Sequence, residues 1–215
     1  MPIKISSIKH SYQIKSPEIN NRLEEFEEIG KNSSNEKLFE EMAFCIFTAG
    51  ASAKMGLNAI NSVKDILEHA SLNQLRRRLR GVYRFPNSRS RYIIHTRNYL
   101  LKNYNMNIRE ILFSFKDPFD RRIFLAKNKN IMGLGFKESS HFLRNIGFKG
   151  YAILDKHMIN CMYELKIIGS NKPPASEKSY IAIENKLKQF SLKIGLDFDE
   201  LDLLLWSEKT GEILK

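Results

Sequence analysis

The sequence predicts an all-α fold in which two helical subdomains lie on either side of a cleft. Apolar residues recur at helical spacing along most of the chain, capping residues precede these runs, and strand-like alternation is almost absent. The 215 residues, 42% of them hydrophobic, suit one or two small domains that share a continuous core. We therefore expect about ten helices in a single unit over residues 1–215, with the two subdomains interleaved along the chain.

Capping residues set the expected helix starts in the first half of the chain. Ser16-Pro17-Glu18 combines an N-cap, a proline suited to the first turn and an acid near the positive helix end. This pattern predicts a helix over residues 16–29. Ser33 and Glu36 have the spacing of a capping box for the next helix. Helical spacing then predicts helices over residues 52–67, 72–80, 88–101 and 107–115.

The second half of the chain shows the same organisation. Asp117-Pro118 predicts one helix start, and Gly135 and Asp155 precede two further helical runs. The short run 151–154 is a candidate extended segment, and Pro173-Pro174 marks the clearest long loop. The expected helices cover residues 118–127 and 135–146, then a helix from residue 155, then residues 176–193 and 199–210.

The charge balance favours a polyanionic partner. The chain carries 35 Lys and Arg against 24 Asp and Glu, a formal charge of +11, and such an excess attracts phosphates. A membrane-surface protein or an ordinary basic globular protein also fits this charge. However, no apolar stretch is long enough to span a membrane, and the N-terminus lacks the apolar core of a secretory signal. We expect a cytoplasmic, nucleoid-associated protein that does not contact a membrane.

The cysteines argue against a metal centre. Cys45 and Cys161 are the only two, they lie far apart, and neither belongs to a CxxC motif. This usage is typical of a reducing compartment and disfavours an iron–sulfur cluster or a zinc ribbon. The sequence therefore predicts neither a bound metal nor another cofactor.

A glycine-rich hairpin between two predicted helices is the most informative segment. Gly133 and Gly135 flank Leu134 in the sequence Ile131-Met132-Gly133-Leu134-Gly135-Phe136-Lys137. Closely spaced glycines permit a tight turn whose amides face outward at a helix N-terminus, where they can bind a DNA phosphate without reading the base. The alternative is an ordinary connection between two helices. The corresponding helix-hairpin-helix motif would cover about residues 118–147.

The residues around this hairpin resemble a known family. The block from Gly133 to Lys137, the run Ser140-His141-Phe142-Leu143-Arg144-Asn145-Ile146-Gly147 and the run Ile153-Leu154-Asp155-Lys156-His157 closely resemble the helix-hairpin-helix DNA glycosylase superfamily with its Gly/Pro–Asp motif. More narrowly, they look like the type-2 8-oxoguanine DNA glycosylases found mainly in archaea. The resemblance extends from about residue 38 to the end of the chain.

The resemblance implies a bifunctional DNA glycosylase and AP lyase. Lys137 would be the nucleophile that excises 8-oxoguanine through a Schiff base and then cleaves the strand by β-elimination, with Asp155 as its carboxylate partner. A lysine amine is almost wholly protonated in neutral water, so it must be desolvated or must lose a proton before it attacks. Two structural alternatives remain: Lys137 as a phosphate contact in a silent hairpin, and Asp155 as a helix N-cap alone.

The resemblance also implies a pocket for a flipped-out base. Phe85 and Trp206 would stack on its two faces, and the terminal carboxylate of Lys215 would pair with the guanine edge. The small-residue loop that includes Ser52 would supply an acceptor for the N7–H of 8-oxoguanine. We place Arg84, Arg89 and His157 at DNA phosphates, and expect His141 to be structural or to bind phosphate.

The expected partner is double-stranded DNA that contains oxidised guanine, bound by a monomer. One alternative function is a related glycosylase for oxidised pyrimidines, but such relatives usually carry four clustered cysteines, which this chain lacks. A second alternative, from a different class, is a non-catalytic helix-hairpin-helix DNA-binding module. Trapping of a covalent protein–DNA adduct with borohydride separates that module from both enzymes.

Overall fold

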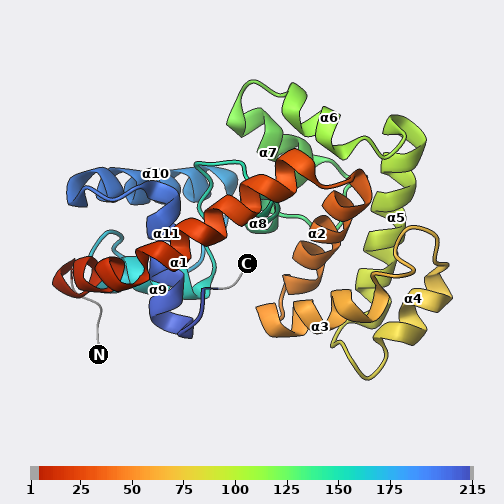
Figure 1. The fold of residues 1–215 in the computed structure, drawn as a ribbon, viewed down its shortest axis with the longest axis horizontal. Helices are drawn as coiled ribbons and strands as arrows, with labels where there is room; N and C mark the ends of the chain where they lie inside the picture. Colours follow the sequence, from red (N-terminus) through yellow and green to blue (C-terminus); the bar gives the residue numbers. More distant parts are fainter. Residues whose placement is uncertain (1–4, 214–215) are drawn as a thin grey trace.

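The computed structural model describes residues 5–213, and these contain α-helices but no β-strand (Figure 1). The all-α prediction is therefore confirmed. Most helices begin and end within a few residues of the predicted positions. In chain order they are α1 (Ile5–Asn32), α2 (Asn35–Thr48), α3 (Ala53–Val63), α4 (Leu72–Leu79), α5 (Pro86–Tyr104), α6 (Ile108–Ser114), α7 (Pro118–Lys127), α8 (Phe136–Asn145), α9 (Lys156–Glu164), α10 (Glu177–Ile194) and α11 (Phe198–Thr210).

Side-chain caps explain several of these boundaries. Asp117 accepts a hydrogen bond from the Phe119 amide at the start of α7, as the Asp-Pro signal predicted. The predicted cap of α2 is wrong by one residue: Ser34, rather than Ser33, accepts the N–H of Lys37. The Ser33 amide instead donates to the carbonyl of Ile29 at the end of α1.

The predicted start of the first helix at Ser16 is also wrong. Helix α1 begins at Ile5 and continues through Pro17 without stopping. An internal proline removes one backbone hydrogen bond, but burial of Ile8 and Ile19 on the face that packs against α11 favours continuation. Tyr12 adds a polar contact to the same helix, since its hydroxyl lies 2.5 Å from a Glu200 carboxylate oxygen.

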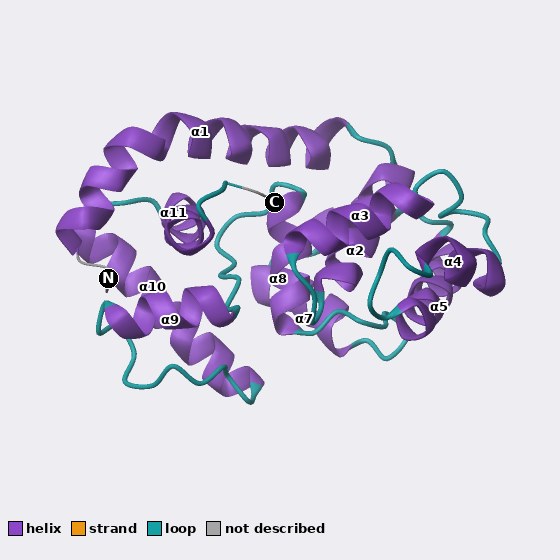
Figure 2. Ribbon diagram, turned by 90° about the horizontal axis from the view of Figure 1, so that it is seen from below, coloured by secondary structure: helices purple, strands orange, loops and turns teal. Residues whose placement is uncertain are grey.

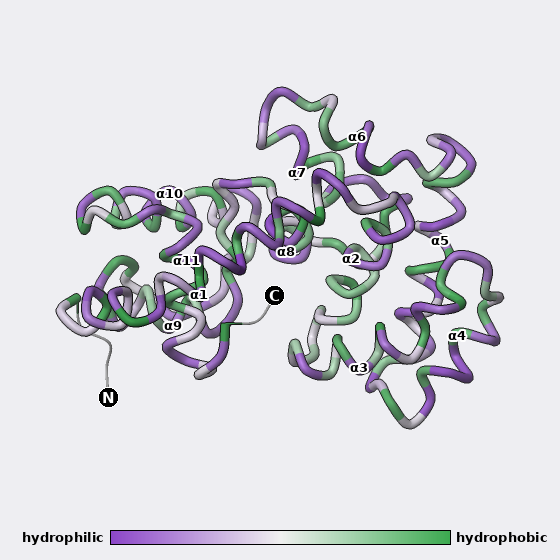
Figure 3. The backbone as a smooth tube through the Cα atoms, in the orientation of Figure 1, coloured by the Kyte–Doolittle hydropathy of each residue, from purple (hydrophilic) through white to green (hydrophobic). Residues whose placement is uncertain are grey.

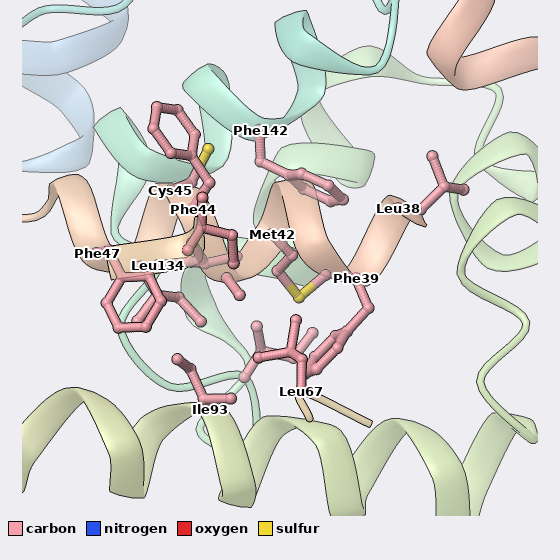
Figure 4. Packing of buried hydrophobic residues seen from close by; sticks show 14 of the residues in the cluster. Leu38, Phe39, Met42, Phe44, Cys45, Phe47, Leu67, Ile93, Leu134 and Phe142 are labelled. Atoms are coloured by element: carbon pink, nitrogen blue, oxygen red, sulfur yellow. The ribbon is translucent and has the colours of Figure 1, made fainter. Parts of the chain in front are cut away.

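The buried apolar side chains form two clusters. Helices α2 to α8 build the first, and Figure 4 shows Met42, Phe44 and Phe47 of α2 beside Phe142 and Ile93. Helices α1, α9, α10 and α11 build the second. Hydrophobic and hydrophilic positions alternate along the helices in Figure 3, as expected where one face of each helix is buried.

Helix α1 lies at the start of the chain, but it packs against α11 near the end of the chain and also crosses α8. Figure 2 shows it running along one side of the molecule. The crossing depends on two glycines. A Cβ on Gly30 would lie 2.0 Å from the Ile146 carbonyl oxygen, and one on Gly147 would lie 2.6 Å from the Glu27 Cα. Only glycine permits this approach, because backbone atoms cannot move aside as a side chain can.

The run 151–154 is buried but belongs to neither a helix nor a strand. Its backbone amides are satisfied by side chains instead. Ala152 donates to Glu184 at 2.9 Å and Ile153 donates to Asp202 at 3.2 Å. The Leu154 amide donates to the Tyr180 hydroxyl at 3.3 Å. Because buried amides need partners, these contacts from α10 and α11 fix the backbone that leads into α9.

No helix between Ile5 and Ile213 combines the length and the apolar character needed to cross a membrane.

Candidate active site

A cavity of about 250 Å³ lies where α8, α11, the start of α9 and the α2–α3 connection meet. Figure 1 shows α8 in the middle of the molecule, between the group of α9 to α11 and the group of α2 to α7. The cavity brings together many of the residues that the sequence singled out. Its lining includes Ser52, Lys137, His141, Asp155, His157 and Trp206, together with Thr48, Ala51, Ala53, Lys54, Arg144, Ile153, Thr210 and Glu212.

Lys137 lies in the first turn of α8, directly after the hairpin. Its side chain is 28% exposed, and its Nζ lies 2.9 Å from Oε1 of Glu138. The amine therefore already has a carboxylate neighbour on its own helix. Glu138 was not among the site residues predicted from the sequence, although it directly follows Lys137 in the chain.

Asp155 is the N-cap of α9 and also lines the cavity. Its Oδ1 accepts the N–H of Met158 at 2.8 Å, and its own amide donates to the Ile153 carbonyl at 2.8 Å. The capping interaction fixes the direction of this carboxylate toward the start of the helix. The structure thus combines the capping role with a position on the cavity wall.

The hairpin between α7 and α8 has the backbone geometry expected for glycine at one of its two glycines. Gly133 has a φ of +87°, which L-residues rarely adopt, and a Cβ there would lie 3.0 Å from side-chain atoms of Ile46 and Tyr92. The Met132 amide donates to the Thr96 hydroxyl at 2.8 Å, which ties the hairpin to α5. Gly135 is the N-cap of α8 with a φ of −85°, which any residue can adopt, and the Glu138 carboxylate lies beside it.

The two predicted stacking residues occupy different surroundings. Trp206 of α11 is partly buried and lines the cavity. Phe85 is outside the lining, at the N-cap of α5. Its ring lies 3.7 Å from the position of a Cβ on Gly50, whose neighbour Ala51 does line the cavity. Phe85 is therefore next to the cavity wall, and its stacking role stays a prediction.

The two arginines that flank Phe85 also differ. Arg84 is exposed, with its guanidinium carbon 5.0 Å from the Phe85 ring centre. Arg89 donates to the Ala49 carbonyl at 2.6 Å and lies 5.3 Å from the Tyr92 ring centre. Arg89 thus braces the connection between α2 and α3, whereas the exposed side chain of Arg84 can reach a DNA backbone.

The remaining site residues are arranged around these groups. His157 is exposed and lines the cavity beside Asp155. His141 is buried, with an edge-to-face contact to Phe44 at 5.6 Å between ring centres, which supports its structural interpretation. Ser52 is the N-cap of α3 and accepts the Met55 amide at 3.2 Å. Lys215 is outside the described residues.

A buried ion pair beneath the cavity was not anticipated. Arg144 of α8 donates to Asp202 of α11 at 2.9 Å, and both side chains are almost wholly buried. Burial raises the pKa of Asp202, and the Arg144 charge acts in the opposite direction. An acid within the apolar run Leu201-Asp202-Leu203 is a signal that could have predicted a buried partner.

Between residues 5 and 213, no three His, Cys, Asp or Glu side chains are close enough together to hold a metal ion.

Comparison with known proteins places this site in a family. The family model Ogg-HhH, described as 8-oxoguanine DNA glycosylase, matches residues 19–196. The 8-oxoguanine DNA glycosylase/AP lyase of Methanocaldococcus jannaschii is 36% identical over 213 residues, which cover 99% of this chain and 98% of that protein. The protein of the same name from Fusobacterium nucleatum is 31% identical, over 98% of this chain and 97% of its own length.

Solved structures agree with the sequence comparison. The crystal structure of the 8-oxoguanine DNA glycosylase of Thermotoga maritima superposes with a TM-score of 0.88 at 32% identity, covering 98% of both chains. The M. jannaschii 8-oxoguanine glycosylase/lyase in complex with 15mer DNA containing 8-oxoguanine gives 0.87 at 34% identity, covering 98% of this chain and 100% of the other. The chain therefore belongs to the helix-hairpin-helix family of archaeal-type 8-oxoguanine DNA glycosylase/AP lyases.

Proposed function

We propose that this protein excises 8-oxoguanine from double-stranded DNA and then cleaves the strand at the abasic site, with Lys137 as the nucleophile and Asp155 as its carboxylate partner. The observation that carries the proposal is that both residues line one cavity with Trp206, in a chain that belongs to this family. The relatives in the comparisons bear the name 8-oxoguanine DNA glycosylase/AP lyase.

In the proposed reaction, the neutral amine of Lys137 forms a bond to C1′ as the bond between C1′ and the base breaks. The base leaves with the bonding electrons and takes up a proton. The attached nitrogen loses a proton, and the ring oxygen then leaves C1′ with the bonding electrons and takes up a proton to become a hydroxyl group. C1′ is now doubly bonded to the lysine nitrogen as a protonated Schiff base. Loss of a proton from C2′ breaks the C3′–O bond and releases the 3′ phosphate. This last step is the β-elimination that cleaves the strand.

Asp155 is suited to the early part of this reaction. Positive charge develops at C1′ as the base departs, and a fixed carboxylate stabilises such charge. The cap interaction with Met158 holds the Asp155 side chain in one orientation, so little reorganisation is needed. The same carboxylate can accept a proton from the lysine amine.

The flipped-out base would be recognised by stacking between two aromatic rings and by hydrogen bonds to its edge. A base inside a duplex hides its glycosidic bond, so it must be flipped out at a cost of a few kcal/mol. Stacking on Trp206 would offset part of that cost, since aromatic contacts contribute about 1–3 kcal/mol per base. Phe85 would supply the second face once DNA is bound, and the Lys215 carboxylate would accept hydrogen bonds from the guanine edge.

DNA contacts outside the pocket would be mainly to phosphate. The hairpin of Gly133 and Gly135 precedes the N-terminus of α8 and would bind one phosphate through backbone amides, and the exposed Arg84 would bind another. His157 lies at the rim of the cavity and is exposed, as a backbone contact requires.

Borohydride trapping on a panel of duplexes tests the proposal. Duplexes with 8-oxoguanine, an oxidised pyrimidine or no lesion are mixed with the protein and borohydride, which reduces a Schiff base to a stable adduct. We expect an adduct with 8-oxoguanine DNA and none with undamaged DNA. A preference for the oxidised pyrimidine would indicate the related glycosylase, and the absence of any adduct would indicate a non-catalytic DNA-binding module.

A matched pair of lysine variants identifies the nucleophile. Lys137→Gln should abolish the adduct but keep duplex binding, whereas Lys54→Gln should keep both. Lys54 is a suitable control because it lines the same cavity and loses the same charge. Trapping that survives in Lys137→Gln would assign the nucleophile to another residue.

A further inference from the structure

Asp202 contacts each of the elements that carry the candidate catalytic residues. Its Oδ2 accepts a hydrogen bond from Nη1 of Arg144 at 2.9 Å, and its Oδ1 accepts the Ile153 amide at 3.2 Å. Asp202 is 1% exposed, and Arg144 and Ile153 both line the cavity. A single buried carboxylate therefore joins α8 and the buried run 151–154 to α11.

Each contact leads to one residue of the proposed mechanism. Arg144 lies on the same helix as Lys137, and the two side chains line the same cavity. The Ile153 carbonyl accepts the Asp155 amide at 2.8 Å, so the position of Ile153 fixes the backbone of Asp155. Trp206 follows Asp202 by one helical turn on α11, at i+4.

We infer that Asp202 is a positioning residue that holds Lys137, Asp155 and Trp206 in one arrangement around the cavity. The inference rests on the proposed function, because it assigns Asp202 to the reaction described above. Asp202 does not line the cavity, so it acts through Arg144 and Ile153 and does not touch the substrate.

The surroundings of the pair make both contacts hard to replace. The pair lies at the boundary between the two hydrophobic clusters, and the Phe26 ring of α1 covers Arg144 at 5.5 Å. Asp199 lies one turn before Asp202 on α11 and accepts the Gly150 amide at 2.9 Å. Loss of the Asp202 charge would leave the Arg144 guanidinium buried without its counter-ion, which is costly in a low-dielectric site.

The test compares two asparagine variants of α11. Asp202→Asn keeps the shape of the side chain and one hydrogen-bond acceptor. It removes the negative charge, so Arg144 faces either a neutral amide oxygen or an NH2 group. Asp199→Asn is the matched control: it is also a buried acid on α11 whose charge acts on Arg144, but its hydrogen bonds go to the Gly150 amide rather than to Arg144 or the run 151–154. Both full-length variants are assayed for duplex affinity, thermal midpoint and single-turnover excision with enzyme in excess.

We expect Asp202→Asn to lower the single-turnover rate by roughly tenfold to a hundredfold, because displacement of reacting groups by about 1 Å has effects of that size. Duplex affinity should be unchanged, and Asp199→Asn should excise at the wild-type rate. This separation of rate from binding would not follow from general destabilisation. Equal losses in both variants, or a wild-type rate in Asp202→Asn, would overturn the inference.

A second variant covers the case in which Asp202→Asn does not fold. Arg144→Lys keeps a cation opposite Asp202 but cannot retain the guanidinium geometry. It should bind the duplex normally and excise more slowly than wild type, and an unchanged rate would contradict the positioning role. A wild-type protein that forms no borohydride adduct would instead refute the proposed function, so the two failures are distinguishable.

Discussion

The Lys137 amine lies 2.9 Å from a Glu138 carboxylate oxygen, in the first turn of the helix that follows the hairpin. The other oxygen of Glu138 is 3.4 Å from the position of a Cβ on Gly135, so this carboxylate lies against the hairpin backbone. The contact between Lys137 and Glu138 must break before the Lys137 amine can bond to C1′ in the proposed reaction.

This relationship predicts that Glu138 restrains the Lys137 amine. Glu138→Gln removes the carboxylate that lies 2.9 Å from the Lys137 amine, so the amine loses its ion-pair partner and can turn toward the cavity more easily. Single-turnover excision should therefore be faster in Glu138→Gln than in wild type. Glu212→Gln, which also removes a cavity-lining carboxylate, should leave the rate unchanged. Slower excision by Glu138→Gln would instead identify Glu138 as a proton acceptor.

Asp155 gives a prediction that separates its two roles. Asparagine caps a helix as well as aspartate does, so Asp155→Asn should keep the thermal midpoint while excision falls by several orders of magnitude. Asp155→Ala should lose the rate and also about 1 kcal/mol of stability, because the Met158 amide loses its partner. Thermal unfolding and single-turnover excision are measured on both variants. Near-normal excision by Asp155→Asn would reduce Asp155 to a structural cap.

Gly133→Ala should damage the hairpin selectively. The positive φ of Gly133 costs an L-residue about 1–2 kcal/mol, and the added methyl would press on Ile46 and Tyr92. The variant should bind duplex DNA less tightly and be less stable. Gly169→Ala is the control, since no atom lies within 4 Å of the added methyl. Equal affinity for Gly133→Ala and Gly169→Ala in a titration with labelled duplex would argue against phosphate binding by the hairpin.

The features that the sequence predicted well are local. Helix caps such as Asp117 and Asp155 depend on residues within one turn, and the left-handed backbone at Gly133 is predicted by the glycine itself. The family resemblance of the Gly133–Lys137 block was likewise a local motif. These local signals were sufficient to predict the all-α class and several residues that line the cavity, including Lys137 and Asp155.

The features that the sequence did not predict depend on distant partners. The continuation of α1 through Pro17 is favoured by packing against α11, which lies at the other end of the chain. The pair of Arg144 and Asp202 joins residues separated by 58 positions. The local sequence of neither helix specifies which buried charges will pair. In α1, tertiary packing overrides the local signal of Pro17, which predicted the first turn of a helix.

A C-terminal extension should impair excision more than DNA binding. The proposed function gives the Lys215 carboxylate a charge-assisted pair with the guanine edge; added residues would convert that carboxylate to an amide and remove the pair, which would be worth about 1.5–3 kcal/mol per hydrogen bond. Lys215→Ala keeps the carboxylate and should be milder. Single-turnover excision is compared for the tagged, untagged and alanine forms on one duplex. Equal rates for the tagged and untagged protein would mean that lesion recognition lies elsewhere.

Asp199 should make folding stability depend on pH. Burial raises the pKa of Asp199 to about 6, so the folded protein favours its neutral form. The resulting stabilisation is complete below the ordinary carboxyl pKa of about 4 and is lost as the pH rises through 6. Asparagine does not titrate. The stability of wild type relative to Asp199→Asn should therefore fall by about 2 kcal/mol between pH 4 and 7, as measured by urea unfolding. A constant or increasing difference would show that Asp199 is ionised throughout this range.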